Sequence, residues 1–232
     1  MKKLQRERFA LCLFSFVFPA VVFFYTGCGI ISVLGTPTNY EREIPAEYDL
    51  AERAERKILV LVYQPGWLKA ATNLRYYLTE AIRENLIKKV KLVPDYLVAY
   101  NELSAFRSGR DDFSLLSPVE VSAALDADMV LFVTVEDYRL NEVTEIGYYK
   151  GFLDVRTVLL ETETGRKLWP ESSKSKSIKV GFEFEAGGRE AAVRRLAAAC
   201  AYCTVRYFYD CPKNKFKIAD ERTDISWESW SK

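Results

Sequence analysis

Two uninterrupted apolar runs have the length and composition of buried strands. The first is Lys57–Tyr63 (KILVLVY), which is rich in branched residues, and the second covers 127–140 (ADMVLFVTVEDYRL). Runs of this kind suit strands that are buried on both faces. We therefore expect residues 58–62 and 129–135 to be neighbouring or near-neighbouring central strands of one sheet.

Between these runs the hydrophobic period changes to that of a helix. One stripe recurs every three or four positions, and it consists of Ala71, Leu74, Leu78, Ala81, Ile82 and Asn85. This spacing predicts an amphipathic helix. A short strand is predicted at 90–95 (VKLVPD), where Pro94 ends it. The order strand, helix, strand indicates a crossover between parallel strands.

The middle of the chain predicts two shorter helices and a loop. Tyr96–Phe106 is a candidate helix, and Arg107–Leu116 is expected to be a loop. Ser117 is a good helix cap because proline follows it and Glu120 stands three residues later. This helix is expected to run to about Asp126.

The second half of the chain is typical of antiparallel strands followed by one long helix. Residues 150–172 predict a strand, a turn at 163–165 and a return strand that ends at Trp169. Residues 177–185 (SIKVGFEFE) alternate strictly, as in a strand with one wet face. After Gly187 and Gly188 a helical stripe follows, made of Val193, Leu196, Ala197, Cys200, Cys203, Thr204 and Tyr207. The predicted fold is α/β, a mixed sheet with a parallel β-α-β start, antiparallel hairpins, and helices packed on the sheet.

The N-terminus has the layout of an export signal. Four basic residues precede an apolar block at 9–24, which is shorter than the ~20 residues of a spanning helix. The following Tyr25-Thr26-Gly27-Cys28 resembles the lipobox of bacterial lipoproteins, although Tyr25 stands where Leu, Val or Ile is usual. The resemblance implies cleavage before Cys28 and acylation of its sulfur by a palmitate-like chain. The alternative is an uncleaved signal anchor.

Both alternatives place the rest of the chain outside the cytoplasm and on a membrane. Gly29, rather than aspartate, follows the cysteine, so the resemblance implies the periplasmic face of the outer membrane. The predicted organisation is a signal peptide at 1–28, a tether at 29–56, one α/β domain at 57–209 and a C-terminal tail at 210–232.

Composition argues against nucleic-acid binding and offers no sign of catalysis. Residues 29–232 contain 29 Lys and Arg against 31 Asp and Glu, and no basic stripe is present. Histidine is absent, which removes the commonest general base and metal ligand. The carboxylate pairs Asp111-Asp112 and Glu136-Asp137 are typical of solvated surface. We expect no enzyme, no cofactor and no metal.

Two motifs carry a resemblance to a protein family. They are Ala127-Asp128, which leads into the second apolar run, and the hairpin segment 161–169 (ETETGRKLW). Together with the β-α-β start they resemble a superfamily of bacterial envelope lipoproteins. It includes the curli-secretion lipoprotein, the activators of penicillin-binding proteins, and lipoproteins of polysaccharide export. The resemblance covers about 57–209 and implies binding or assembly, without catalytic residues.

Two functional hypotheses remain open from the sequence. The first is a membrane-anchored interaction or assembly factor for a cell-envelope machine, such as cell-wall synthesis or export, with an envelope protein as partner. The second is a subunit of a homo-oligomeric periplasmic ring. An enzyme that uses carboxylates is a third and weaker hypothesis.

Three cysteines lie near the end of the predicted domain. Outside the cytoplasm disulfides persist, and a bond from Cys211 to Cys200 or Cys203 would pin the tail to the long helix. The alternative is three reduced core cysteines, because free cysteine buries readily. No histidine is available to complete a zinc site.

Aromatic residues supply the candidate partner surfaces. Tyr138, Tyr148 and Tyr149 surround the loop after the second apolar run, and strand ends in α/β sheets often carry function. Trp227 and Trp230 stand among charged residues in the tail, and exposed tryptophan is enriched at binding hot spots. The alternative for all five is ordinary packing against the domain.

Overall fold

The computed structural model describes residues 43–68, 73–144 and 147–212, which form an α/β domain around a five-stranded mixed sheet. The strands of this sheet are β2 (Ile58–Tyr63), β3 (Met129–Thr144), β4 (Tyr148–Glu161), β5 (Lys167–Trp169) and β6 (Lys176–Glu185). β2 runs parallel to β3, and β3 runs antiparallel to β4. Along its other edge, β4 pairs first with β6 and then with β5. The predicted α/β class with a mixed sheet is confirmed.

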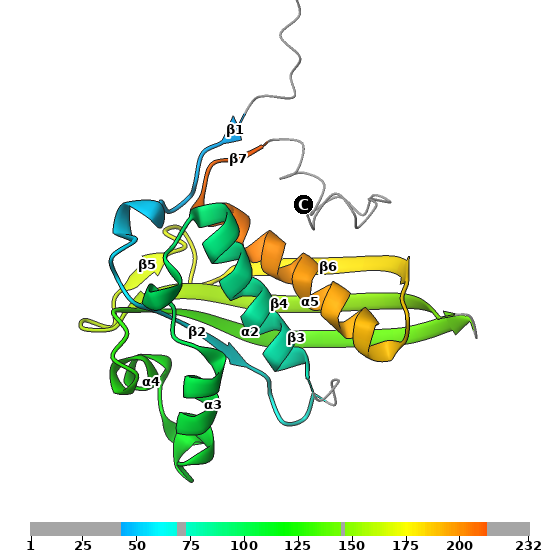
Figure 1. The fold of residues 1–232 in the computed structure, drawn as a ribbon, viewed down its shortest axis with the longest axis horizontal. Coiled ribbons are helices and arrows are strands. Elements are labelled where there is room, and N and C mark those ends of the chain that lie inside the picture. The colour runs from blue at the N-terminus through cyan, green and yellow to red at the C-terminus, as the bar shows by residue number, and fades with distance from the viewer. Residues whose placement is uncertain (1–42, 69–72, 145–146, 213–232) are drawn as a thin grey trace, which may run out of the picture. The chain divides into compact units, whose positions relative to one another are not determined.

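Helices cover the two faces of the sheet unequally (Figure 1). The α-helices are α2 (Leu74–Asn85), α3 (Tyr100–Ser108), α4 (Pro118–Ala124) and α5 (Arg189–Val205). α2 and α5 lie side by side on one face, over the larger hydrophobic core. α3 and α4 close a smaller core on the other face, at the parallel end of the sheet.

The two apolar runs are buried neighbours, as predicted, but only one of them is central. Ile58 pairs with Met129, and all five residues from Ile58 to Val62 are buried. β3 lies between β2 and β4, whereas β2 is an edge strand. The start of β2 is nevertheless covered on its outer edge, because Val98 donates its backbone N–H to Ile58 O at 3.0 Å.

The predicted strand at 90–95 is wrong. α2 continues into a π-helical turn, Leu86–Val90, and Lys91 then adopts a left-handed conformation before a 3-10 turn at Pro94–Tyr96. The apolar residues Val90 and Leu92 are buried in the core beneath α2 instead of joining the sheet. The parallel neighbour of β2 is therefore β3, and the crossover contains α2, α3 and α4.

The other helix and turn predictions are confirmed, with boundaries shifted by a few residues. At α4, Glu120 N–H donates to Ser117 Oγ at 3.3 Å, and Ser117 N–H donates to Glu120 Oε2 at 2.7 Å. These bonds form the predicted capping box. The return turn at 163–165 is also present, with Gly165 at a positive φ of 69°.

A β-bulge at Glu136 reverses the alternation along β3. Before it, Met129 to Val135 place their odd-numbered residues in the larger core; after it, the even-numbered Tyr138 and Leu140 occupy that core. An extra residue in one strand changes which side chains face each side of a sheet. The bulge therefore keeps both halves of the strand against α2 and α5.

Candidate functional site

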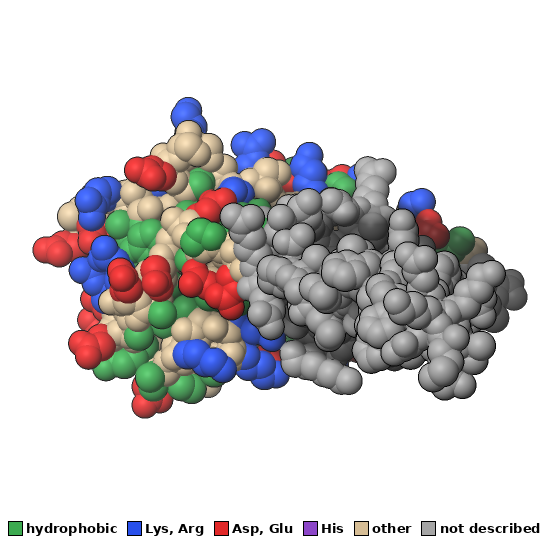
Figure 2. Space-filling model, turned by 90° about the horizontal axis from the view of Figure 1, so that it is seen from above, with side chains coloured by type: hydrophobic (Ala, Val, Ile, Leu, Met, Phe, Trp, Pro, Cys, Tyr) green, Lys and Arg blue, Asp and Glu red, His purple; other side chains and the backbone are tan. Residues whose placement is uncertain are grey.

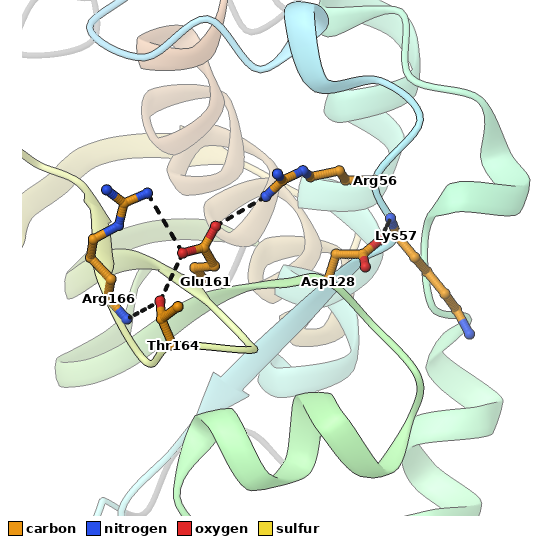
Figure 3. A network of polar contacts seen from close by, with 6 residues as sticks. All are labelled: Arg56, Lys57, Asp128, Glu161, Thr164 and Arg166. Carbon is orange, nitrogen blue, oxygen red and sulfur yellow. Dashed lines mark hydrogen bonds and ion pairs between the residues drawn. The ribbon is translucent and has the colours of Figure 1, made fainter.

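The motif residue Asp128 joins three strand ends, and Figure 3 shows it beside Lys57. Its carboxylate accepts the backbone N–H of Lys57 at 2.7 Å, immediately before β2. Its backbone oxygen accepts the N–H of Thr162 at 2.9 Å, immediately after β4. Asp128 thus fixes the start of β3 between its two neighbours, and its carboxylate is occupied by the backbone.

The second motif residue, Glu161, lies in a closed polar network (Figure 3). Thr164 Oγ1 donates to its carboxylate at 2.7 Å, and Arg56 and Arg166 form ion pairs with it at 3.2 and 3.6 Å. The Thr164 hydroxyl in turn accepts the backbone N–H of Arg166. The Thr164 hydrogen bond, then the Arg56 guanidinium, lowers the pKa of Glu161. The network holds the hairpin turn and ties it to the segment before β2.

Trp169, the last residue of the same motif, contacts both the first and the last described segments of the domain. Its indole Nε1–H donates to Glu47 Oε2 at 3.0 Å, and Lys176 Nζ binds the other Glu47 oxygen at 2.6 Å. The Trp169 ring packs against Phe208 and Tyr207, with centroids 4.9 and 5.5 Å away. The tryptophan is buried, so its contribution is to packing.

Residues 43–50, which we call the terminal strap, belong to the folded domain rather than to a tether. β1 (Glu43–Ile44) pairs with β7 (Cys211–Pro212), and Leu50 is buried. Tyr207 O accepts the backbone N–H groups of Glu47 and Tyr48 at 2.9 and 3.2 Å. The segment available as a tether after Cys28 is therefore shorter than the predicted 29–56. Figure 1 shows the strap and β7 leaving the domain side by side.

Two of the three candidate tyrosines are buried and one is exposed. Tyr138 and Tyr149 are buried in the core, 9% and 3% exposed, so they do not form a partner surface there. Burial raises the pKa of Tyr138, against the opposing charge of Arg189. Only Tyr148 presents its ring at the surface, 37% exposed. The candidates Cys28, Trp227 and Trp230 lie outside the described residues.

The structure reveals exposed aromatic rings that the sequence reasoning missed. Trp67 is 73% exposed in the loop that follows β2, and Tyr63 ends that strand with half of its surface exposed. Tyr76 of α2 is also exposed, and its ring packs edge-on against Tyr100 of α3. The available signal was Pro65-Gly66-Trp67, a tryptophan in a turn at the carboxyl end of a buried strand.

Cys200, Cys203 and Cys211 are all buried and are in the reduced form in the structure. Burial raises the pKa of the Cys200 thiol well above its usual range, and Thr204 Oγ1 donates to Cys200 O one turn away. The Tyr202 hydroxyl lies 3.7 Å from Cys211 Sγ. A disulfide to Cys211 remains a prediction.

The described ranges contain no group of three or more Cys, Asp and Glu residues placed to hold a metal ion. Within the same ranges, no helix combines the length and apolar character needed to cross a membrane. Figure 2, which looks onto the domain from above the view of Figure 1, shows acidic and basic side chains interspersed on the described part of that face.

No known protein family matches the chain, and no curated protein matches it. Solved structures that match part of the chain include a lipoprotein from Neisseria meningitidis, 21% identical, with a TM-score of 0.36 over 54% of this chain and 83% of that one. The PelC dodecamer from Paraburkholderia phytofirmans is 14% identical, with a TM-score of 0.39 over 73% and 96% of the two chains. The LpoB C-terminal domain from Salmonella enterica is 18% identical, with a TM-score of 0.34 over 59% and 84%. All three TM-scores are low, so these likenesses assign neither family nor function.

Proposed function

We propose that this chain is an envelope lipoprotein, anchored through an acylated Cys28, that acts as a non-catalytic interaction or assembly factor for a cell-envelope machine. The observation that carries the proposal is the position of the terminal strap. The domain's first strand begins at Glu43, so only residues 29–42 separate it from the lipidated cysteine. At ~3.5 Å per extended residue, that length holds the domain within about 50 Å of the bilayer.

The arrangement of the motif residues supports a binding role. The carboxylates of Asp128 and Glu161 are occupied by backbone and arginine partners, and Trp169 is buried. The motifs thus stabilise a scaffold, while exposed rings such as Trp67 and Tyr148 lie at its surface. Exposed aromatic residues on a rigid domain are common anchors of protein interfaces. The partner we propose is an envelope protein.

A second candidate function, a subunit of a homo-oligomeric periplasmic ring, is favoured by the two edges of the sheet. β6 pairs only with β4 among the described strands, and β3 continues for ten residues beyond Thr134, where β2 ends. Two different open edges on one subunit permit head-to-tail contacts, which close into rings.

Intact-mass measurement of the protein purified from membranes tests the anchor. The expected product begins at Cys28 and carries added lipid mass, and the Cys28→Ser variant stays unprocessed. An unmodified chain beginning at Met1 would contradict the proposal.

Light scattering then separates the two functions, because a monomer supports the interaction factor and a defined high oligomer supports the ring. Crosslinking in the native envelope, followed by mass spectrometry, identifies the partner.

A further inference from the structure

A cluster of two arginines and two tyrosines lies where α2 meets α3, and we call it the basic–aromatic seam. It consists of Arg75 and Tyr76 from the first turn of α2, and of Tyr100 and Arg107 from the two ends of α3. The rings of Tyr76 and Tyr100 meet edge to face with centroids 4.9 Å apart, and Tyr76 is 43% exposed. The Arg107 guanidinium lies 4.7 Å from the ring centroid of Phe113.

The positive charge of the seam is not balanced within the part of the chain that the structure describes. Neither Arg75 nor Arg107 has an ion pair there, and the three carboxylates on the same helices are engaged elsewhere. Glu80 binds Arg83 at 2.7 Å, Glu84 binds Lys88 at 2.6 Å, and Glu102 lies 3.9 Å from Lys57. Arg75 Nε is buried without a hydrogen-bond partner among the described residues.

The positive charges of Arg75 and Arg107 also repel each other. Burial, followed by the repulsion of Arg75, lowers the pKa of Arg107 to about 10. An anion placed between them would relieve this repulsion and accept charge-assisted hydrogen bonds, which are about twice as strong as neutral ones. The exposed Tyr76 ring beside the arginines would add an apolar contact of the kind found at hot spots.

The chain itself contains a segment with the complementary chemistry. Residues 220–231 read DERTDISWESWS and hold four carboxylates against one arginine, together with Trp227 and Trp230. The acidic groups match the two unbalanced guanidiniums, and the indole rings match the tyrosines. We propose that residues 220–231 dock on the basic–aromatic seam of the same chain.

The length of the tail permits this docking. Pro212 follows the end of α5, and α5 lies beside α2, because Tyr77 donates its hydroxyl to Glu190 and Arg194 stacks over Tyr77 at 5.0 Å. The return from Pro212 to the start of α2 is therefore about the length of α5, roughly 26 Å at 1.5 Å per residue. The linker from Pro212 to Asp220 spans about 28 Å when fully extended, which just covers this distance. A tethered segment has an effective concentration of order millimolar, so weak contacts suffice.

In the docked state the tail would cover the seam, and a partner could bind there only by displacing the tail. A partner that displaces the tail must itself present an acidic segment with aromatic residues. This last step rests on the proposed function, because it assumes a protein partner; the docking of the tail does not depend on it.

Photo-crosslinking in the full-length chain tests the docking. A photoreactive benzoylphenylalanine replaces Tyr76, and equal amounts of light and heavy isotope-labelled chains are mixed before irradiation. We expect crosslinks from position 76 to peptides within 220–231 of the same isotope label. Crosslinks only between labels, or to no residue of 220–231, would overturn the proposal.

Charge reversal tests the chemistry of the contact. Changing Asp220, Glu221, Asp224 and Glu228 to lysine leaves the described domain unaltered and should reduce the intrachain crosslink at least tenfold. Adding Arg75→Glu and Arg107→Glu to that variant should restore it, provided that circular dichroism shows a folded domain. The matched control, Arg156→Glu with Lys179→Glu on the face of the sheet opposite α2 and α5, should not restore it. Equal crosslinking in all variants would contradict an electrostatic contact.

Discussion

The two faces of the sheet differ in what covers them, although the same strands supply both. Along β4, Leu153 and Val155 are fully buried under the face of α2 and α5, while Asp154 and Arg156 point to the opposite side. There the side chains form a ladder of ion pairs: Glu136 with Arg156, Asp154 with Lys179, and Lys150 with Glu183. At the parallel end, by contrast, α3 and α4 cover this second face.

Helices therefore cover both faces of the sheet at its parallel end, but only one face at the other end. The smaller core ends near Phe132, beyond which the second face carries mainly charged side chains, with the Phe152 ring lying beneath the Arg139 guanidinium. The free energy of unfolding should therefore depend strongly on the α2 and α5 face, less on the α3 and α4 face, and little on the ion-pair ladder.

The largest effect is expected at Trp169, on the face of α2 and α5. Trp169→Ala removes a buried ring and its hydrogen bond to Glu47. Loss of a buried aromatic side chain costs about 3–5 kcal/mol. Urea unfolding at neutral pH measures this loss, and a change below 1 kcal/mol would show that these contacts do not stabilise the domain.

A smaller effect is expected at Leu103, which is buried in the smaller core under α3. Leu103→Ala should lower the free energy of unfolding by about 2–3 kcal/mol, the low end of the range for such truncations. Half-buried rings such as Phe106 and Phe113 border this core and can relax into the space. If Leu103→Ala proved more costly than Trp169→Ala, the ranking of the two faces would be wrong.

The Glu161 network should make the stability of the hairpin sensitive to acid. The folded state lowers the pKa of Glu161 below its unfolded value of ~4.3, so the network stabilises the domain above that pH and the stabilisation disappears as the pH falls through the folded pKa. Glu161→Gln should therefore destabilise the protein at pH 7 and make little difference near pH 2–3. Thermal unfolding across this range measures both, and a pH-independent difference would contradict the mechanism.

The smallest effect is expected in the ion-pair ladder. Lys179→Ala breaks the ion pair with Asp154, in which the lysine side chain is 65% exposed. Exposed ion pairs contribute about 0–1 kcal/mol and are screened by salt. The change in urea midpoint should be slight and should vanish at 1 M NaCl. A loss as large as that of Leu103→Ala would show that this exposed face contributes to stability as much as a buried one.

The fold could be predicted where one local signal dominated. Branched apolar runs located β2 and β3, Ser117 with Glu120 located the start of α4, and strict alternation located β6. The prediction failed at 90–95, where Val90 and Leu92 serve the helical core and not a sheet. It also failed at 43–56, because the bonds that order the strap come from Tyr207 and Asp210, far away in the sequence.

The candidate partner surface was predicted less well, because a β-bulge changes which residues of β3 face the core. Uninterrupted alternation along β3 would place Tyr138 on the same side as Phe132 and Thr134, and the bulge at Glu136 turns it into the core instead. Tyr149 shares the parity of Leu153, which alone could have separated it from the exposed Tyr148. The Arg75–Arg107 pair has no sequence signal, since it forms only when α2 meets α3.

The pairing of β1 with β7 also bears on how the domain opens. Chain ends are ordinarily the places where local unfolding begins, and their amide hydrogens exchange with solvent fastest. In this domain the first strand protects the last one, and Tyr207 O holds the chain that follows β1. Fraying at either end therefore exposes the other, so the two most distant parts of the described sequence form one cooperative unit of exchange.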